Sequence, residues 1–308
     1  MADDLATRVV DSLSRNYRGT HEHRAAHAKG FCVSGVFTPT PEAAGLTRAA
    51  HFRGNPVAVT VRFSNGSGSL ESADHHLDGR GMAVKFHLPG GEATDLVSIS
   101  QRVFFVRTPE DFLAFTDARK PDPETGRPDP SAIGDFLIRH PEAEAAFTEV
   151  LTTPPPKSLA TTAYNALHAF RWLDEEGGSR WVRYHWVPES GVATIERDKA
   201  KELGRDYLRT ELIERMSHGP VLFRLEVAIG EEGDDPDDPT AGWPADRRRV
   251  RAGRLELVAI SADQDAECER QVFDPMRLTE GIEPSADPIL NFRPLAYGVS
   301  IRRRLKLA

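Results

Sequence analysis

Hydrophobic positions in the middle of the chain recur with a period of two. Residues 57–63 alternate valine or phenylalanine with smaller or polar residues, and residues 82–88 repeat the pattern. Successive side chains of an extended strand point to opposite faces, so this period is typical of half-buried strands. Similar patterns predict further strands near residues 95–107, 180–187, 219–229 and 248–260.

Other segments carry apolar residues at every third or fourth position, the spacing of one helix face. They predict helices near residues 4–17, 109–118, 131–151, 198–217 and 287–305. Charged, turn-rich segments at 120–123 and 231–239 are predicted to be solvated loops. This order favours an α+β fold with helices around a mainly antiparallel sheet. With 308 residues, 39% of them hydrophobic, the chain can bury one sizeable core, and we expect a single domain over residues 1–308.

Charge and cysteine content limit the partners and the compartment. The net charge of −8 argues against a polyanion, so we expect no nucleic acid partner. No apolar run is long enough to span a bilayer, and the first residues lack the pattern of a secretion signal, so we expect a cytoplasmic protein. Two cysteines, Cys32 and Cys268, do not make a disulfide framework, and we expect two reduced thiols.

Two short runs more than 260 residues apart resemble the two faces of a catalase haem site. They are residues 24–30, R-A-A-H-A-K-G, and residues 293–297, R-P-L-A-Y. Between them, further runs match the catalase family in order: V-R-F-S at 61–64, D-G-R-G-M-A-V-K-F at 78–86, D-L-V at 95–97, F-F-V-R-T-P at 104–109, and F-D-P at 273–275. The resemblance covers roughly residues 20–305 and is closest to the short catalase-related peroxidases of bacteria.

The family resemblance implies a fold and a cofactor. The fold would be a closed antiparallel barrel of eight strands with surrounding helices, without the family's long amino-terminal arm and carboxy-terminal helical region. The cofactor would be haem b, with Tyr297 as the axial ligand of its iron. A free tyrosine has a pKa of about 10, so a phenolate ligand needs help from a cation. Arg293, four residues before Tyr297 on the same helix face, can supply it. Pro294 indicates that this helix begins or bends there.

On the opposite side of the cofactor, the resemblance makes His27 the catalytic group and Ser64 the residue that orients its ring. Histidine titrates in the range needed to take a proton from a peroxide and return it to the leaving oxygen. Asp78 resembles the aspartate of the family's substrate channel. Ile99 stands where catalases carry an asparagine, and it cannot donate a hydrogen bond to peroxide. Ala26 and Gly66 are smaller than the usual valines, which predicts a wider cavity for bulkier substrates.

The remaining predicted contacts hold the cofactor. Buried propionates require cations, and Arg24, Arg62 and Arg304 match the family's propionate-binding arginines. Phe112 resembles the ring that stacks on the porphyrin. His168 resembles a histidine that supports Arg293 and Tyr297, although an ordinary barrel histidine is the alternative.

These patterns predict a haem-dependent peroxidase that reduces hydroperoxides, organic ones in preference, with a small electron donor and with weak catalase activity. Three alternatives stay open: true hydrogen peroxide dismutation, rearrangement of a fatty-acid hydroperoxide as in allene oxide synthases, and a non-catalytic barrel that binds haem or lipid. The expected partners are a small-molecule peroxide and an electron donor, and a homodimer is possible.

Overall fold

The computed structural model describes residues 2–17, 19 and 21–307. The helices are α1 (Ala2–Asn16), α2 (Pro41–Ala44), α3 (Pro109–Ala118), α4 (Pro130–Arg139), α5 (Glu144–Thr152), α6 (Arg197–Glu202), α7 (Tyr207–His218) and α8 (Pro288–Arg304). The strands are β1 (Gly30–Pro39), β2 (Val57–Asn65), β3 (Arg80–His87), β4 (Ala93–Ile99), β5 (Tyr164–Asn165), β6 (Phe170–Leu173), β7 (Ser179–Pro188), β8 (Val221–Ile229), β9 (Arg249–Ile260) and β10 (Ile282–Pro284). Single helical turns lie at Ala50–Phe52, Pro89–Gly91, Pro141–Ala143, Leu159–Thr161 and Asp265–Glu269, the last of them π-helical.

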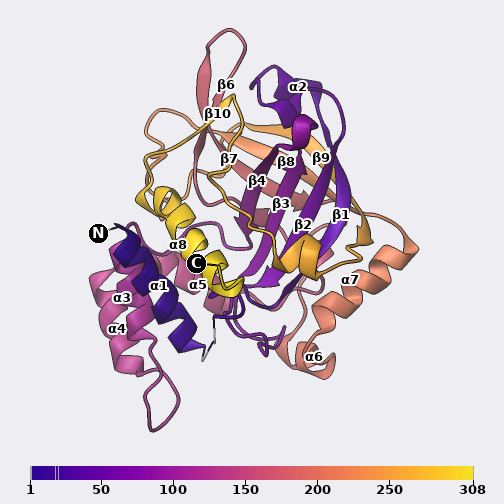
Figure 1. Ribbon diagram of the computed structural model, residues 1–308. Coiled ribbons are helices and arrows are strands. Elements are labelled where there is room, and N and C mark those ends of the chain that lie inside the picture. The colour runs from indigo at the N-terminus through magenta and orange to yellow at the C-terminus, as the bar shows by residue number, and fades with distance from the viewer. Residues whose placement is uncertain (1, 18, 20, 308) are drawn as a thin grey trace.

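Eight of the strands close into an antiparallel barrel (Figure 1). Around the ring the order is β1, β2, β3, β4, β5, β7, β8 and β9, and β9 pairs with β1 to complete it. β6 pairs with β7 outside this ring, and β10 pairs with β6. The closed barrel confirms the predicted fold, and closure leaves these eight strands without an open edge.

Aromatic side chains fill the barrel interior. Phe37 of β1 makes edge-to-face contacts with Phe86 of β3 and Trp186 of β7, at centroid distances of 5.2 and 6.1 Å. All three side chains are buried. Edge-to-face packing suits the aromatic quadrupole, and here it joins strands that are not neighbours in the ring. The interior is therefore a packed core, and a cavity has to form outside it.

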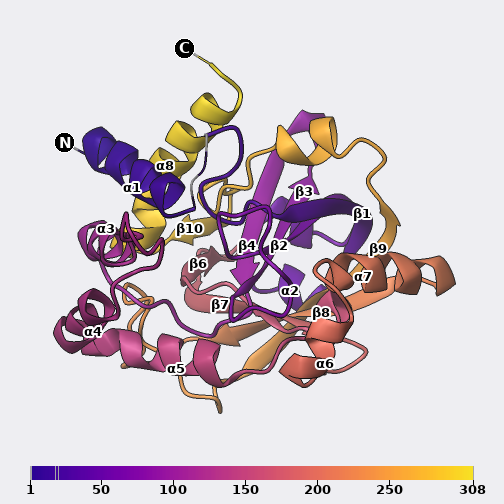
Figure 2. The same cartoon turned by 90° about the horizontal axis from the view of Figure 1, so that it is seen from below.

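Helices cover two sides of the barrel. Figure 2 shows α1, α3 and α8 together on one side and α6 and α7 on the other. Helices α1 and α8 of the first group also share a small apolar cluster, which includes Val10 of α1 and Val299 of α8. α8 begins at a strong cap, since Asp287 accepts hydrogen bonds from the backbone N–H groups of Ile289 and Leu290.

Several predicted elements have different boundaries in the structure. The helix predicted over 131–151 is two helices, because Pro141 ends α4 and starts a short turn before α5. The helix predicted over 198–217 is also two, separated at Gly204, whose φ of 95° is outside the helical region. The strand predicted over 95–107 ends at Ile99. Pro294 lies inside α8, so the helix does not begin there.

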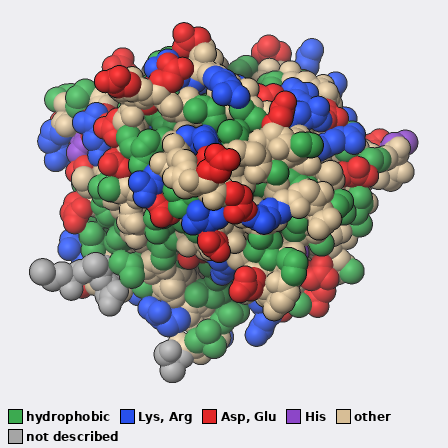
Figure 3. All heavy atoms as spheres, turned by 90° about the horizontal axis from the view of Figure 1, so that it is seen from above, with side chains coloured by type: hydrophobic (Ala, Val, Ile, Leu, Met, Phe, Trp, Pro, Cys, Tyr) green, Lys and Arg blue, Asp and Glu red, His purple; other side chains and the backbone are tan. Residues whose placement is uncertain are grey.

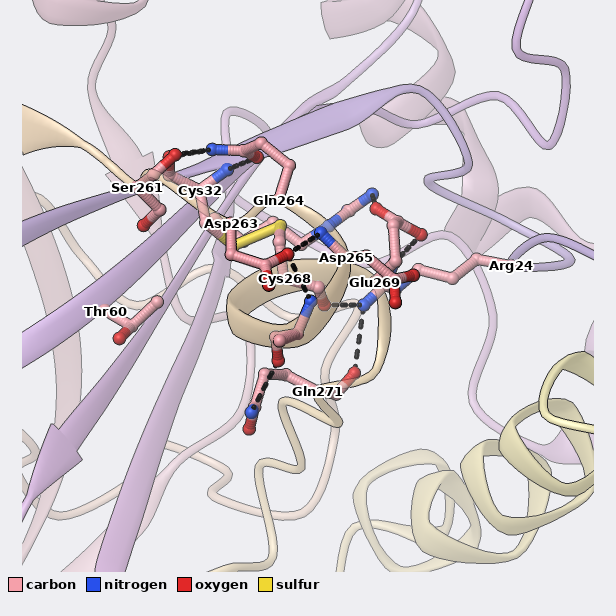
Figure 4. Close-up of a disulfide and its surroundings, with 12 residues drawn as sticks. Arg24, Cys32, Thr60, Ser261, Asp263, Gln264, Asp265, Cys268, Glu269 and Gln271 are labelled. Atoms are coloured by element: carbon pink, nitrogen blue, oxygen red, sulfur yellow. Dashed lines mark hydrogen bonds and ion pairs between the residues drawn. A yellow bond between two sulfur atoms is a disulfide. The ribbon is translucent and has the colours of Figure 1, made fainter.

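The prediction of two reduced thiols is wrong for this structure, because Cys32 and Cys268 form a disulfide. Cys32 lies on β1 and Cys268 on the π-helical turn, with a Cα–Cα distance of 5.5 Å and both side chains fully buried (Figure 4). The two residues are 236 positions apart, so only the closure of the fold brings them together. A local pattern gives no signal for such a pair.

The surface mixes charges of both signs. Figure 3 shows Lys and Arg interspersed with Asp and Glu over one face of the molecule. Within the described residues, no helix is long and apolar enough to cross a membrane.

Candidate functional site

A cavity of about 300 Å³ lies between the barrel wall and helices α1, α3 and α8. Its lining combines apolar side chains of the three helices with polar groups from β2, β4, β5 and the segments before β1 and after β5. The residues predicted from the sequence that line it are Arg24, His27, Arg62, Ser64, Ile99, Phe112, His168, Arg293, Tyr297 and Arg304. The fold thus brings residues from both ends of the chain to one place.

His27 lies at the barrel side of the cavity, just before β1. Its Nδ1 is 3.0 Å from Ser64 Oγ on β2, the contact expected from the sequence. The backbone is in the left-handed region with φ of 55°, and its N–H donates to Gly66 O at 3.0 Å. A non-glycine residue in this region has a local energetic cost, which the surrounding contacts offset. The ring is therefore held in one orientation.

Burial makes the His27 imidazole a neutral base. Burial, followed by the charges of Arg62, Arg293 and Arg24, lowers the pKa of His27 to about 3. At neutral pH the ring therefore carries one proton, and one ring nitrogen can accept a second.

Gly81 of β3 has no side chain, and His27 and Ser64 lie in the space that a side chain would fill. A Cβ at this position would lie 2.6 Å from Ser64 Oγ and 2.9 Å from His27 Nδ1. Both distances are shorter than real Cβ contacts, so a side chain here would displace the histidine or the serine. This requirement was not predicted, although Gly81 stands in the matched run at 78–86.

Tyr297 and Arg293 occupy one face of α8. The Tyr297 hydroxyl accepts hydrogen bonds from Arg293 Nη2 at 2.6 Å and Nε at 3.1 Å. The spacing of four residues on a helix produces this contact, as predicted. The guanidinium thus fixes the position of the phenolic oxygen with two charge-assisted hydrogen bonds.

A relay of side chains continues behind Arg293. Arg293 Nη1 donates to His168 Nε2 at 2.9 Å, and His168 Nδ1 lies 2.5 Å from Asp287 Oδ2. Because arginine can only donate, His168 accepts through Nε2 and donates its own proton from Nδ1 to Asp287. His168 and Asp287 are both buried, and burial lowers the pKa of His168. His168 therefore supports Arg293, as the sequence suggested.

Asp287 was not predicted as part of the site. One carboxylate oxygen accepts from His168, while the other caps the first turn of α8. The signal that could have found it is its position directly before Pro288, where capping residues stand before a helix.

Three arginines of the cavity lining lie close to one another. Arg24, Arg62 and Arg304 lie around the carboxylate of Glu269, which is 2.5 Å from Arg24 Nη1 and 3.6 Å from Arg62 Nη2. Burial lowers the pKa of Arg62 to about 9 and that of Arg304 to about 10. Within the described chain, the Nε atoms of Arg62 and Arg304 are buried without a hydrogen-bond partner.

Such a cluster is suited to an anionic ligand. One buried and two half-buried guanidiniums with one nearby carboxylate leave an excess of positive charge, and the two orphaned N–H groups each need an acceptor. A ligand with two carboxylates would meet both needs. Glu269 itself was missed by the sequence analysis, because an isolated glutamate in a charged run carries no local signal.

Two apolar residues complete the predicted set. Ile99, the last residue of β4, lines the same cavity as His27. Phe112 of α3 lies on the opposite wall, where its ring is stacked on Phe104 at a centroid distance of 6.0 Å. The cavity therefore presents flat aromatic surface on one side and aliphatic surface beside the histidine.

Asp78 lies apart from the cavity. It is not among the described residues that line the cavity, and its Oδ2 accepts a hydrogen bond from Ser67 N at 2.8 Å. A Cβ at Gly66 would meet Asp78 Oδ1 at 2.5 Å, so this glycine makes room for the aspartate and does not widen the cavity. Ala26 does line the cavity, as expected.

Sequence comparison relates the chain to known proteins. The family model described as "Catalase" matches residues 5–307. A "Catalase-related peroxidase" of Synechococcus elongatus is 35% identical over 97% of this chain and 88% of its own length. A protein of the same description from Mycolicibacterium paratuberculosis is 38% identical over 91% of this chain and 88% of its own length.

Structural comparison agrees. Catalase A from Saccharomyces cerevisiae superimposes with a TM-score of 0.86 at 26% identity, over 96% of this chain and 64% of that one. The structure described here thus covers about two thirds of the length of that catalase.

Proposed function

Because the chain belongs to the catalase family and is an oxidoreductase that acts on peroxide, we propose that it is a haem b-dependent peroxidase. It reduces hydroperoxides, organic ones in preference, with electrons from a small donor, and it has weak catalase activity. The observation that carries this proposal is the relay from Asp287 through His168 and Arg293 to Tyr297, which faces the same cavity as a neutral His27.

The residues around the cavity suit haem. Tyr297 would bind the iron through its phenolic oxygen, which Arg293 holds in place with two hydrogen bonds. Arg24, Arg62 and Arg304 would hold the two propionates, and the orphaned Nε atoms of Arg62 and Arg304 support this role. Phe112 would lie against the porphyrin face. When bound, haem supplies the site where peroxide is activated and where the oxidising equivalents are held.

His27 and Ser64 provide the proton transfers. The neutral imidazole takes the proton from the peroxide oxygen that is nearer to the cofactor and delivers it to the other oxygen, which leaves as water or an alcohol. Ser64 fixes the ring through its 3.0 Å contact with Nδ1, so that Nε2 is free for this transfer.

Ile99 supports a preference for peroxidase turnover. Dismutation requires a second hydrogen peroxide molecule to be held beside His27 while it gives up two hydrogens. An isoleucine offers no hydrogen bond for this step, whereas electrons from a donor do not depend on it. The descriptions of the two bacterial relatives are consistent with such a preference.

Steady-state rates test the proposed function. The haem-loaded protein is assayed with hydrogen peroxide and with an alkyl hydroperoxide, each with and without an oxidisable dye. We expect donor-dependent turnover that is faster with the alkyl hydroperoxide, and slow oxygen release. Rapid oxygen release from hydrogen peroxide without a donor would identify a true catalase, and loss of the hydroperoxide without donor oxidation would identify a rearrangement enzyme.

Three further predictions from the sequence stay predictions. They are the cytoplasmic location, the homodimer and the single domain over residues 1–308.

A further inference from the structure

The disulfide anchors a segment that forms one end of the cavity. This tethered segment, residues 261–273, follows β9 and includes the π-helical turn. Cys268 joins it to Cys32 of β1, and the Gln264 side chain adds hydrogen bonds to Cys32 N at 2.8 Å and Cys32 O at 2.9 Å. Figure 4 shows these contacts on one side of the turn and Arg24 on the other.

The tethered segment is buried at its two ends, Ser261 and Phe273, and has few anchors between them. Between residues 262 and 272, Cys268 is the one buried residue, and most of its neighbours are exposed. A single turn with so little buried apolar surface has low local stability by itself. The disulfide is therefore what chiefly attaches this turn to the barrel.

From this anchored position the segment holds Arg24. The carbonyl oxygens of Cys268 and Gln271 accept hydrogen bonds from Arg24 Nη2 at 2.8 and 2.9 Å, and Glu269 accepts from Nη1 at 2.5 Å. The same Gln271 oxygen accepts from Arg304 Nη2 at 3.3 Å. Residues 268–271 thus accept four hydrogen bonds from Arg24 and Arg304, and all four depend on the position of Cys268.

Glu269 also offsets the repulsion between the arginines. Its carboxylate lies between Arg24 and Arg62, two buried cations that oppose each other's charge. Without a fixed carboxylate the guanidiniums would repel one another and move apart toward solvent. The N–H groups of Arg62 and Arg304 would then no longer be held in place for a ligand.

We propose that the Cys32–Cys268 disulfide is a positioning device for the carboxylate-binding end of the cavity: it fixes Glu269 and the adjoining carbonyls against Arg24 and so slows the release of the cofactor's propionates. This inference rests on the proposed haem function. Neither cysteine touches the reacting atoms, so the disulfide acts on cofactor retention and not on the chemical step.

The test measures the rate at which haem passes from the protein to excess apomyoglobin. Wild-type protein is compared before and after treatment with tris(2-carboxyethyl)phosphine. The phosphine supplies two electrons to the S–S bond and becomes the phosphine oxide with oxygen from water, while the cysteines become two thiols. A Cys32→Ser/Cys268→Ser variant is measured with and without the same reagent.

We expect transfer at least about tenfold faster after reduction and in the double variant, the effect of losing roughly one good hydrogen bond to a charged group. The phosphine should not change the rate of the double variant. The absorption spectrum of the bound haem should be the same in all samples, because the hydrogen bonds of Arg293 to Tyr297 and His168 involve neither cysteine. Leu212→Ala, a cavity mutation in buried Leu212 of α7, controls for general loss of stability and should not alter the transfer rate.

Several outcomes would overturn the inference. One is a transfer rate that is the same before and after reduction of the wild type, and another is a double variant that the phosphine accelerates as much as the wild type. The others are a Leu212→Ala variant that releases haem as fast as the double variant, and two free thiols in untreated denatured protein. If no sample binds haem at all, the proposed function fails and takes the inference with it. If oxidised wild type binds haem and reduction changes nothing, the inference alone fails.

Discussion

Proton transfer at this site depends on one histidine that is neutral and fixed. His27 is half-buried, and its ring is held by Ser64 and by the absence of a side chain at Gly81. Burial lowers the pKa of His27 to about 3, so protonation does not compete with its role as a base at neutral pH. Its contribution should therefore appear in the rate of peroxide cleavage and not in cofactor binding.

His27→Ala should slow the reaction with peroxide by about 10²–10⁴-fold, the usual contribution of general acid–base assistance. Haem content should be unchanged, since the arginines and Tyr297 stay in place. Rapid mixing with an alkyl hydroperoxide, followed by haem absorbance, gives the rate. An unchanged rate at matched haem content would remove His27 from the mechanism.

Ile99 determines how peroxide is held beside His27. Ile99→Asn should raise the ratio of oxygen release to donor oxidation by about tenfold, if one hydrogen bond worth roughly 1–1.5 kcal/mol is restored in the transition state. Ile99→Val, which supplies no amide, is the matched control and should leave the ratio as it is. The ratio comes from oxygen-electrode and dye assays on the same samples. Equal ratios for the Asn and Val variants would mean that Ile99 does not set the reaction preference.

At the scale of elements, α8 connects helix formation to the site. Asp287 caps the helix with one oxygen and holds His168 with the other. Asp287→Ala should lower the free energy of unfolding by about 2–4 kcal/mol, because it removes a cap and leaves a buried N–H unpaired. Asp287→Asn keeps a capping oxygen but turns an N–H toward His168 Nδ1, so it should recover only the capping part of this loss, about 1 kcal/mol. Urea unfolding of the haem-free variants measures the difference, and equal losses for Asn and Ala would contradict the capping role.

The sequence predicted the elements whose pattern is local. Residues 57–63 alternate in composition and form β2, and α3 occupies the predicted range at 109–118. β1 was missed, because Gly35 and Pro39 interrupt its pattern and several adjacent residues are buried on both faces. The predicted helix at 131–151 failed for a related reason, since Pro141 breaks a run whose apolar spacing continues across it.

Among the site residues, too, those in a local pattern were predicted and those without one were not. His27, Arg293 and Tyr297 could be identified because each stands in a short recognisable run. Glu269 and the partner of Cys32 could not, because their positions depend on contacts across 200 or more residues that arise only when the barrel closes. Asp78 stands in a matched run and lies outside the cavity, where it accepts a hydrogen bond from Ser67 N, and its place in a substrate channel stays a prediction.

For the molecule as a whole, the barrel is a support and the cavity lies at its side. Segments from both ends of the chain meet there, together with the disulfide that links β1 to the tethered segment. In the loop-entropy description, a link between residues this far apart lowers the stability of the unfolded state by about 5 kcal/mol. Reducing compartments keep thiols reduced, so this disulfide and the predicted cytoplasmic location oppose each other.

Buried neutral histidines should make the whole molecule sensitive to acid. His51 packs on Phe52 and Phe86, and burial lowers its pKa to about 3. The unfolded chain, with a histidine pKa of about 6.5, takes up the proton first as pH falls, so stability is present above pH 6.5 and is lost between about 6.5 and 3. When the pH falls from 7.5 to 5, the protonation of His51 in the unfolded chain should lower the free energy of unfolding by roughly 2 kcal/mol.

The variant His51→Leu removes this titration. Its free energy of unfolding should fall less between pH 7.5 and 5 than that of the wild type, by roughly 2 kcal/mol. Urea unfolding of haem-free protein at the two pH values gives the comparison. Parallel pH dependence in the two proteins would show that His51 does not contribute to acid sensitivity.

The central claim is that Tyr297 binds the iron of a haem in this cavity, and one measurement tests it most directly. Haem is added to the wild type and to Tyr297→Phe, and the electronic absorption and electron paramagnetic resonance spectra of the ferric proteins are recorded. We predict a high-spin ferric spectrum typical of tyrosinate ligation in the wild type and its loss in the variant, whose arginines and His27 are intact. The same iron ligation in both proteins would contradict the assignment of Tyr297 and with it the proposed function.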